Sequence, residues 1–175
     1  MKLPVWLMLP AALWSCHPGK GNGKVQGSDT IASMPAVAVA AKAYGAPPPG
    51  IPASTWAQMH AQDSIFEDSS RPTSWEAAGF TDPVAFKCFF VRFREWVTKD
   101  NVDSITNHIQ FPLHLAGSPA WFREEYPHIF NHRVKSALYR QRLDRIFRNG
   151  QGAMVGNGTI WFVQNQGQYW VSAVN

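Results

Sequence analysis

The sequence predicts an α+β protein in which helices come first and a small antiparallel sheet follows. Two observations support this fold class. Apolar residues recur at helical spacing between Phe86 and Val97. Near the C-terminus, evenly spaced turn signals separate short apolar runs at Asn149-Gly150, Gly156-Asn157-Gly158 and Asn165-Gln166-Gly167. The predicted order is helix, helix, strand, helix, strand, strand and strand, which is typical of an α+β domain.

The first predicted helix begins at Thr81-Asp82-Pro83, where a capping side chain precedes a proline at the first helical position. Its apolar stripe consists of Phe86, Phe89, Phe90, Phe93, Trp96 and Val97. The opposite face is expected to be solvated and carries Lys87, Arg92, Arg94, Glu95, Thr98 and Lys99. Cys88 lies beside the stripe, so we expect it to act as a small hydrophobic residue at the edge of the core.

The remaining elements follow from weaker patterns. A second helix is expected over residues 101–109, and an edge strand over 110–115, where an edge position tolerates Pro112. The helical pattern from Trp121 to Phe130 is expected to break at Pro127. Asn131 can cap the next helix, which Arg145-Ile146-Phe147 closes. Strands are expected over 151–155, 159–164 and 168–174. The last two are apolar on both faces, so one face should pack on helices and the other can line a concavity.

Three segments carry a resemblance to known proteins. They are Phe111-Pro112-Leu113, Tyr126-Pro127-His128-Ile129-Phe130 and Asn149-Gly150-Gln151-Gly152-Ala153-Met154-Val155-Gly156-Asn157-Gly158-Thr159-Ile160-Trp161-Phe162. With the element order, they resemble the NTF2-like superfamily, and more closely small exported bacterial proteins and lipoproteins of uncharacterised type. The resemblance implies an NTF2-like cone, in which a curved antiparallel sheet packs on N-terminal helices and often encloses a pocket. Such folds host isomerases, dehydratases, ligand binders and protein-binding modules, so no single activity is implied.

Residues 1–16 have the order of a secretory signal, because Lys2 precedes an apolar run that is too short to cross a bilayer. Leu13-Trp14-Ser15-Cys16 resembles the lipobox of bacterial lipoproteins. This resemblance implies lipidation of Cys16 and a membrane anchor. A plain secretory signal that contains a cysteine and an uncleaved anchor are the alternatives. We expect a periplasmic, membrane-anchored lipoprotein or, alternatively, a soluble secreted protein.

Four segments are predicted along the chain. They are a lipoprotein-type signal peptide over residues 1–16, a Gly/Ala/Pro-rich tether over 17–53, a short helical lead-in over 54–78 and the NTF2-like domain over 79–175. The tether is poor in large apolar residues, so it cannot bury enough surface to offset its ordering entropy. The lead-in is expected to pack loosely on the domain or to present part of a binding edge.

The composition restricts the class of partner. The net charge is +4 in a chain of 175 residues. A basic chain can bind nucleic acid, anionic lipid, cell-wall polymer or an acidic protein. An exported chain rarely meets nucleic acid, so we expect a partner from the other three classes. If Cys16 is acylated, Cys88 is the single remaining thiol, and no internal disulfide is expected.

The sequence holds no evident catalytic arrangement. Asp100 and Asp103 are explained by helix capping, and Tyr169 is the best candidate for a pocket residue, although a core tyrosine is the commoner case. His128 and His132 have the spacing of a helical metal pair, but the break expected near Pro127 would separate them. We therefore expect a protein that is not an enzyme, with no metal and no cofactor.

The candidate binding residues follow a basic run that includes Arg133 and Lys135. They are Arg140, Arg142, Arg145, Arg148, Asn149, Gln151, Trp161 and Trp170. A solvated helix face explains many such runs, and the functional alternative is a docking patch for an acidic protein. The sequence therefore favours a tethered envelope binding protein, in its most concrete form an inhibitor or immunity-type protein against an envelope-acting enzyme or toxin. The alternative is an NTF2-like cone pocket that binds or converts a small apolar ligand.

Overall fold

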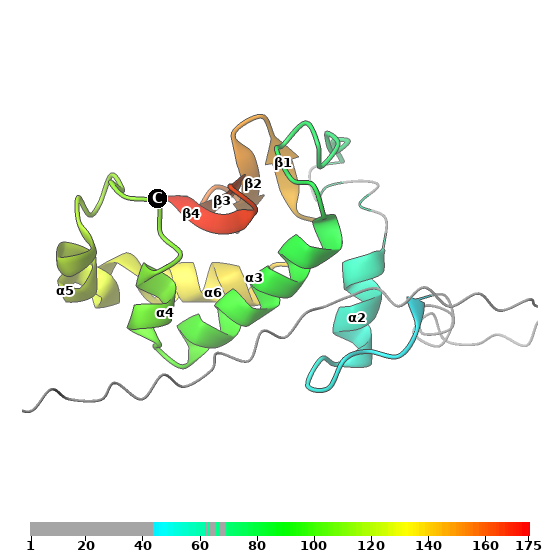
Figure 1. Ribbon diagram of the computed structural model, residues 1–175, viewed down its shortest axis with the longest axis horizontal. Helices are drawn as coiled ribbons and strands as arrows, with labels where there is room; N and C mark the ends of the chain where they lie inside the picture. The colour runs from blue at the N-terminus through cyan, green and yellow to red at the C-terminus, as the bar shows by residue number, and fades with distance from the viewer. Residues whose placement is uncertain (1–43, 62, 64–65, 67–68) are drawn as a thin grey trace, which may run out of the picture. The chain divides into compact units, whose positions relative to one another are not determined.

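The computed structural model describes residues 44–61, 63, 66 and 69–175 (Figure 1). The predicted signal with Cys16 and residues 17–43 of the predicted tether lie outside the described residues. The helices are α2 (Ala53–His60), α3 (Pro83–Thr98), α4 (Val102–Thr106), α5 (Pro119–Ile129) and α6 (His132–Arg140). The strands are β1 (Phe147–Asn149), β2 (Gly152–Val155), β3 (Ile160–Asn165) and β4 (Gln168–Val174). Among the described residues, no helix has both the length and the apolar character needed to cross a membrane.

The α+β class is confirmed. Consecutive strands pair antiparallel in the order β1-β2-β3-β4, with Val155 opposite Ile160 and Val163 opposite Trp170. The sheet is not closed or strongly curled, unlike the expected cone. Its first two strands contain three and four residues. Strands this short rise about 10–13 Å, which is too little to wrap around a long helix.

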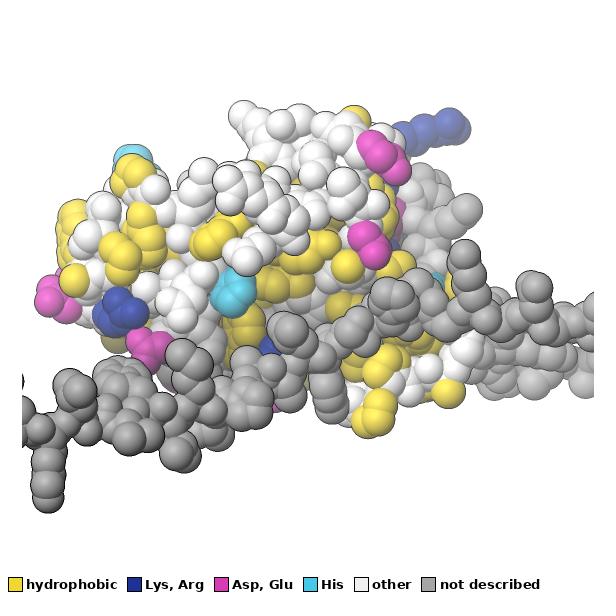
Figure 2. Space-filling model, in the orientation of Figure 1, with side chains coloured by type: hydrophobic (Ala, Val, Ile, Leu, Met, Phe, Trp, Pro, Cys, Tyr) yellow, Lys and Arg dark blue, Asp and Glu magenta, His cyan; other side chains and the backbone are white. Residues whose placement is uncertain are grey.

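Helix α3 forms as predicted and packs against one face of the sheet. The Asp82 carboxylate caps its first turn by accepting a hydrogen bond from the Ala85 N–H at 2.9 Å, and Pro83 occupies the first helical position. Phe86, Phe90 and Phe93 are fully buried. Their rings lie 5.3–5.8 Å from the Phe162 ring of β3. Aromatic side chains therefore fill the space between helix and sheet, and Figure 2 shows further apolar side chains reaching the surface on one face of the molecule.

Two predicted elements are shorter than expected. The helix predicted over residues 101–109 is limited to α4, which the Asn101 side chain caps through the Ser104 N–H. No continuous strand forms over residues 110–115. Instead, a bridge joins Ile109 to Val171 at the edge of β4, and a second bridge joins Leu113 to Ala116. The reason is that Gly117 and Ser118 turn the chain immediately after these residues and leave no length for pairing.

The predicted break at Pro127 is wrong. Helix α5 continues through Pro127, and the Phe130 N–H still donates to the Tyr126 carbonyl at 2.8 Å. A proline in the last turn removes a single helical hydrogen bond, which a helix packed through buried Phe122 and Tyr126 tolerates. The expectation that Arg145-Ile146-Phe147 closes the next helix is also wrong. Helix α6 ends at Arg140, and Phe147 begins β1, which the sequence pattern missed.

The lead-in over residues 54–78 contributes to the core, contrary to the expectation of loose packing. Met59 of α2 is 1% exposed, and Trp75 and Ala78 are also buried. The Trp75 ring packs edge-on against Phe80, 5.5 Å away. Burying a large aromatic side chain contributes about 1.5–3 kcal/mol, which fixes this segment on the domain. The folded part therefore includes residues that the sequence reading placed before it.

Candidate functional site

The predicted arginines gather where α6 ends. We define the basic corner as Tyr139, Arg140, Arg142 and Arg145. Helix α6 stops at Arg140 because the backbone of Gln141 becomes extended, with φ −61° and ψ 121°. Arg140, Arg142 and Arg145 are all exposed. Tyr139 is 79% exposed, which is unusual for an aromatic side chain, and it directly precedes Arg140 in the chain.

Asp144, which lies within the same loop, neutralises only part of the positive charge of the basic corner. Asp144 accepts two hydrogen bonds from Arg142, at 3.0 Å from Nε and 2.7 Å from Nη2. These hydrogen bonds lower the pKa of the Asp144 carboxyl, and Arg145 adds a longer-range contribution. Among the described residues, neither Arg140 nor Arg145 has a carboxylate within ion-pair distance. The corner therefore presents a surplus of positive charge to solvent.

Gln141 holds the backbone of the basic corner in place. Its side-chain Nε2 donates to the carbonyls of Arg142 and Arg145, at 3.0 and 2.9 Å. Its Oε1 accepts the Gly156 N–H from the β2–β3 turn at 3.0 Å. Gly156 has φ +63°, and an added Cβ would lie 2.4 Å from the Ala137 Cβ, so this turn packs directly on α6. Arg142 and Arg145 thus lie on a preorganised loop directly after the end of α6 at Arg140.

The structure places the remaining predicted binding residues elsewhere. Asn149 ends β1 and Gln151 lies in the turn before β2, where the Asn149 side chain accepts the Gln151 N–H at 2.8 Å. Trp161 and Trp170 are half-buried on the face of the sheet opposite Phe162 and α3, as the register shows. The ring of Trp161 packs against Phe147 of β1. These residues therefore do not join the basic corner.

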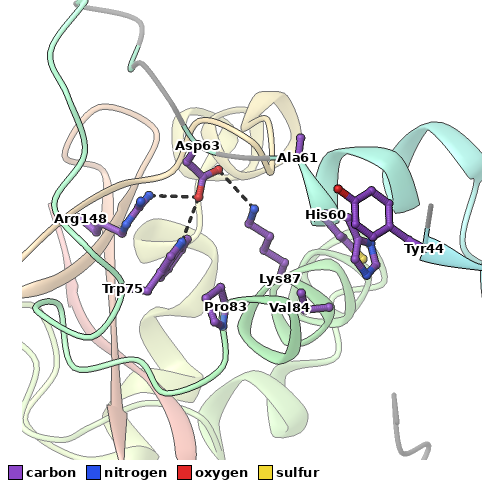
Figure 3. A pocket seen from close by; sticks show the side chains of 10 residues that line it. Tyr44, His60, Ala61, Asp63, Trp75, Pro83, Val84, Lys87 and Arg148 are labelled. Carbon is purple, nitrogen blue, oxygen red and sulfur yellow. Dashed lines mark hydrogen bonds and ion pairs between the residues drawn. The ribbon is translucent and has the colours of Figure 1, made fainter. Parts of the chain in front are cut away.

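Arg148 also departs from the predicted patch, because it is 5% exposed. Its Nη1 donates to Asp63 Oδ2 at 3.1 Å. The same Asp63 oxygen accepts from Trp75 Nε1 at 2.9 Å, and Oδ1 accepts from Lys87 Nζ at 3.2 Å. We call Asp63, Trp75, Lys87 and Arg148 the charge cluster; Figure 3 shows the Asp63 carboxylate between the two cations. The solvated position predicted for Lys87 is therefore wrong.

The charge cluster is buried and unbalanced. Both carboxylate oxygens of Asp63 are used, but two cations surround one anion. The Trp75 ring offers its face to Arg148 at 4.3 Å, a cation–π contact that offsets part of the imbalance. Burial lowers the pKa of Lys87, and Asp63 opposes this effect by favouring the ammonium form. Burial also lowers the pKa of Arg148, because the charged guanidinium group loses hydration, and Asp63 again opposes this effect.

Sequence reasoning missed the charge cluster because its members are far apart in the chain. Asp63 precedes Lys87 by 24 residues and Arg148 by 85 residues. Lys87 follows Phe86 directly and precedes Phe90 by three residues, at the border of the apolar stripe. A lysine at such a border is normally solvated through its flexible end. The position of Lys87 at the border of the apolar stripe was the signal in the sequence that its side chain could instead point into the core.

A pocket of about 510 Å³ adjoins the charge cluster. Asp63, Lys87, Trp75 and Arg148 line one part of it, and Tyr44 and His60 line another. The rings of Tyr44 and His60 stack with their centroids 4.5 Å apart. In Figure 3 this aromatic pair and Arg148 lie on opposite sides of Lys87. The pocket combines cationic groups with aromatic walls, as small-molecule sites commonly do.

The residues that the sequence suggested for a pocket or a metal site lie among packing contacts and helix caps. Tyr169 stacks on Phe80 at 6.1 Å, and burial raises its pKa to about 12. The Sγ of Cys88 lies 4.0 Å from the Sδ of Met59. Asn131 caps α6 through the N–H groups of Arg133 and Val134. In the part of the chain that the structure describes, no three His, Cys, Asp or Glu side chains are grouped to hold a metal ion.

Comparison with known proteins identifies no relative. No family model, no curated protein and no solved structure matches this chain.

Proposed function

We propose that this chain is a non-enzymatic binding protein of the bacterial envelope, which docks an acidic protein partner through the basic corner. The observation that carries the proposal is the exposure of Tyr139 and Arg140 at the end of α6 and of Arg145 on the preorganised loop that follows. Arginine and tyrosine are the residue types that most often dominate binding energy at protein interfaces. Because Gln141 already fixes the loop, docking would cost little ordering entropy.

The charge of the basic corner supports an acidic partner. Arg142 is paired with Asp144, but Arg140 and Arg145 are available for bidentate hydrogen bonds to carboxylates. An acidic rim around the active site of an envelope enzyme or toxin fits this chemistry. In this form the protein acts as an inhibitor or immunity-type protein, and the N-terminal lipid on Cys16 keeps it at the membrane.

Charge reversal at the basic corner tests the proposal. The double variant Arg140→Glu and Arg145→Glu should keep its melting temperature, because exposed substitutions usually change stability by less than about 0.5 kcal/mol. Its association with the partner should become slower and less dependent on salt, since the rate of encounter follows the surface charge. The partner is to be captured from envelope extract with the tagged full chain, and the kinetics measured between low and high salt.

The matched control is Arg92→Glu, which reverses a cation on α3 outside the basic corner. If the double variant folds and binds the captured partner with the same salt-dependent kinetics as the parent, the docking proposal is wrong. A loss of binding in Arg92→Glu of equal size would show that net charge matters and that the basic corner does not.

The anchor is tested separately at Cys16. If the cysteine is acylated, Cys16→Ala should abolish labelling of the protein by a radioactive or clickable fatty acid. Unchanged labelling would refute the lipobox interpretation and leave a soluble secreted protein as the alternative. The docking proposal does not depend on this result.

The alternative from the sequence, an NTF2-like cone pocket for a small apolar ligand, receives less support. The space between α3 and the sheet, where such a cone would have its cavity, holds the buried rings of Phe86, Phe90, Phe93 and Phe162. Membership of the NTF2-like superfamily stays a proposal, and a strongly curled sheet in a crystal structure would support it.

A further inference from the structure

The charge cluster contains one more positive charge than negative charge, in a place where solvent compensates little. The exposed fractions of the Lys87, Asp63 and Arg148 side chains are 2%, 4% and 6%. An unpaired charge at this depth is costly, so proteins usually pair it or shift its protonation. Glu76 and Asp144 act on the cluster only at longer range, Glu76 on Arg148 and Asp144 on Lys87. Among the described residues, no carboxylate other than Asp63 forms an ion pair with these two cations, so the cluster favours an additional anion.

Within the described part of the chain, both cations have unused donors. Lys87 Nζ makes one hydrogen bond to these residues, with Asp63, although an ammonium group has three protons. The Nε of Arg148 is buried and has no hydrogen-bond partner among the described residues. Buried polar groups are normally paired, and an exception indicates a missing ion or ligand, a catalytic role or stored strain. Here the unpaired donors belong to residues that line a pocket of about 510 Å³.

The far end of the pocket is aromatic and open. Tyr44 is 45% exposed and stacks on His60. Since Lys87 is almost fully buried, the charge cluster forms the inner wall and the aromatic pair forms the outer end (Figure 3). A flat apolar group can lie against aromatic rings while a polar end reaches inward.

We propose that this pocket binds a small aromatic anion, with its carboxylate or phosphate group on Lys87 and Arg148 and its ring against Tyr44 and His60. The anion would accept charge-assisted hydrogen bonds from the ammonium group and the guanidinium group, and would so supply the acceptors that these donors lack. The site is independent of the basic corner, so either proposal can fail without the other.

Titration calorimetry of the full chain, in mild detergent and at low salt, tests the site with benzoate, phenyl phosphate and neutral benzamide as probes. We expect benzoate or phenyl phosphate to bind with a stoichiometry of one, and benzamide to show no binding. The tighter of the two anions identifies the group that the site prefers. Lys87→Met should weaken the anion by about tenfold or more, because it removes a charged hydrogen-bond donor. Lys99→Met, which removes an exposed lysine at the other end of α3, should leave the affinity unchanged.

A second variant covers the case in which Lys87→Met does not fold. Tyr44→Ala changes an exposed side chain and should weaken benzoate by about three- to tenfold through the lost aromatic contact. The proposal is overturned if the parent binds neither anion at millimolar concentration, or if benzamide binds as well as benzoate. It is also overturned if folded Lys87→Met retains the parent affinity or, where that variant is unfolded, if Tyr44→Ala retains it.

Discussion

Arg145 and Arg148 are three residues apart and have opposite environments. Arg145 is exposed in the basic corner, whereas Arg148 is 5% exposed and bound to Asp63. The difference arises because β1 begins between the two residues, at Phe147. Phe147 and Arg148 lie on β1, where alternate side chains point to opposite faces, and this directs Arg148 toward Asp63. A run of arginines in a sequence can therefore contain both an exposed basic surface and a buried ion pair.

The comparison also separates two uses of charge. In the basic corner, solvent screens the guanidinium groups, so each contributes little to stability, and Arg140 and Arg145 form no ion pair with a described carboxylate. In the charge cluster, solvent is excluded, so each group depends on its neighbours and the removal of one is costly. Stability measurements on matched variants can therefore assign each charge to one of the two regions.

The largest effect is expected for Asp63→Ala. This change leaves Lys87 and Arg148 buried side by side without a counter-ion, and breaking a buried pair in this way costs about 3–5 kcal/mol. The free energy of unfolding should be measured by urea denaturation. The control is Asp103→Ala, which removes an 80% exposed carboxylate from its pair with Arg123 and should cost less than about 1 kcal/mol. Similar losses in the two variants would contradict a buried charge cluster.

A smaller effect is expected for Arg148→Met compared with Arg145→Met. The first change removes a hydrogen bond to Asp63 and a cation–π contact with Trp75, but Lys87 still neutralises the carboxylate. We expect a loss of about 1–3 kcal/mol for Arg148→Met. Arg145→Met should change stability by less than about 0.5 kcal/mol. If urea denaturation showed a larger loss of unfolding free energy for Arg145→Met than for Arg148→Met, the assignment of Arg148 to the buried cluster and of Arg145 to the surface would be wrong.

A pH effect is expected from Tyr169 at the border between core and surface. Burial raises its pKa from 10.0 to about 12, with a further contribution from the charge of Asp82. Between these values the unfolded chain has lost a proton that the folded chain keeps, so this tyrosine makes stability fall as the pH rises from 10 to 12. Tyr169→Phe should flatten that decline in melting temperature. Tyr139→Phe, at a 79% exposed position, should not.

A small effect on stability is expected for Asp144→Asn. Its pair with Arg142 lies at the surface, where such pairs contribute less than about 1 kcal/mol. The same change adds one net positive charge to the basic corner, so the captured acidic partner should associate faster at low salt. Stopped-flow association measured with and without added salt separates this electrostatic gain from a change in the contact itself. An unchanged association rate would count against electrostatic steering by the basic corner.

Local patterns predicted much of the fold. The Asp82 cap and the Phe86, Phe90 and Phe93 stripe specified α3, and the Asn-Gly and Gly-Asn-Gly turns specified the hairpins, because these signals act over a few residues. The close packing of the lead-in and the existence of β1 were missed, since Trp75 and Phe147 gain their environments from distant segments. The curvature of the sheet likewise depends on strand lengths that the turn signals do not specify.

For the candidate site, the sequence predicted the exposed arginines of the basic corner but not the charge cluster. Exposed charges need no partner, so composition and spacing indicate them directly. Lys87 and Arg148 depend on a carboxylate from another segment, and a single sequence contains no record of that pairing. The same limit applies to Trp161 and Trp170, which the sheet register directs away from the arginines.

The unequal separations within the charge cluster also affect how easily its contacts form. Lys87 lies 24 residues from Asp63, whereas Arg148 lies 85 residues from it. The entropy lost on closing a loop grows with the logarithm of its length, so the contact with Arg148 costs about 1 kcal/mol more to close than the contact with Lys87. The ammonium group therefore pairs with the carboxylate at the lower entropic cost, and the guanidinium group completes the cluster.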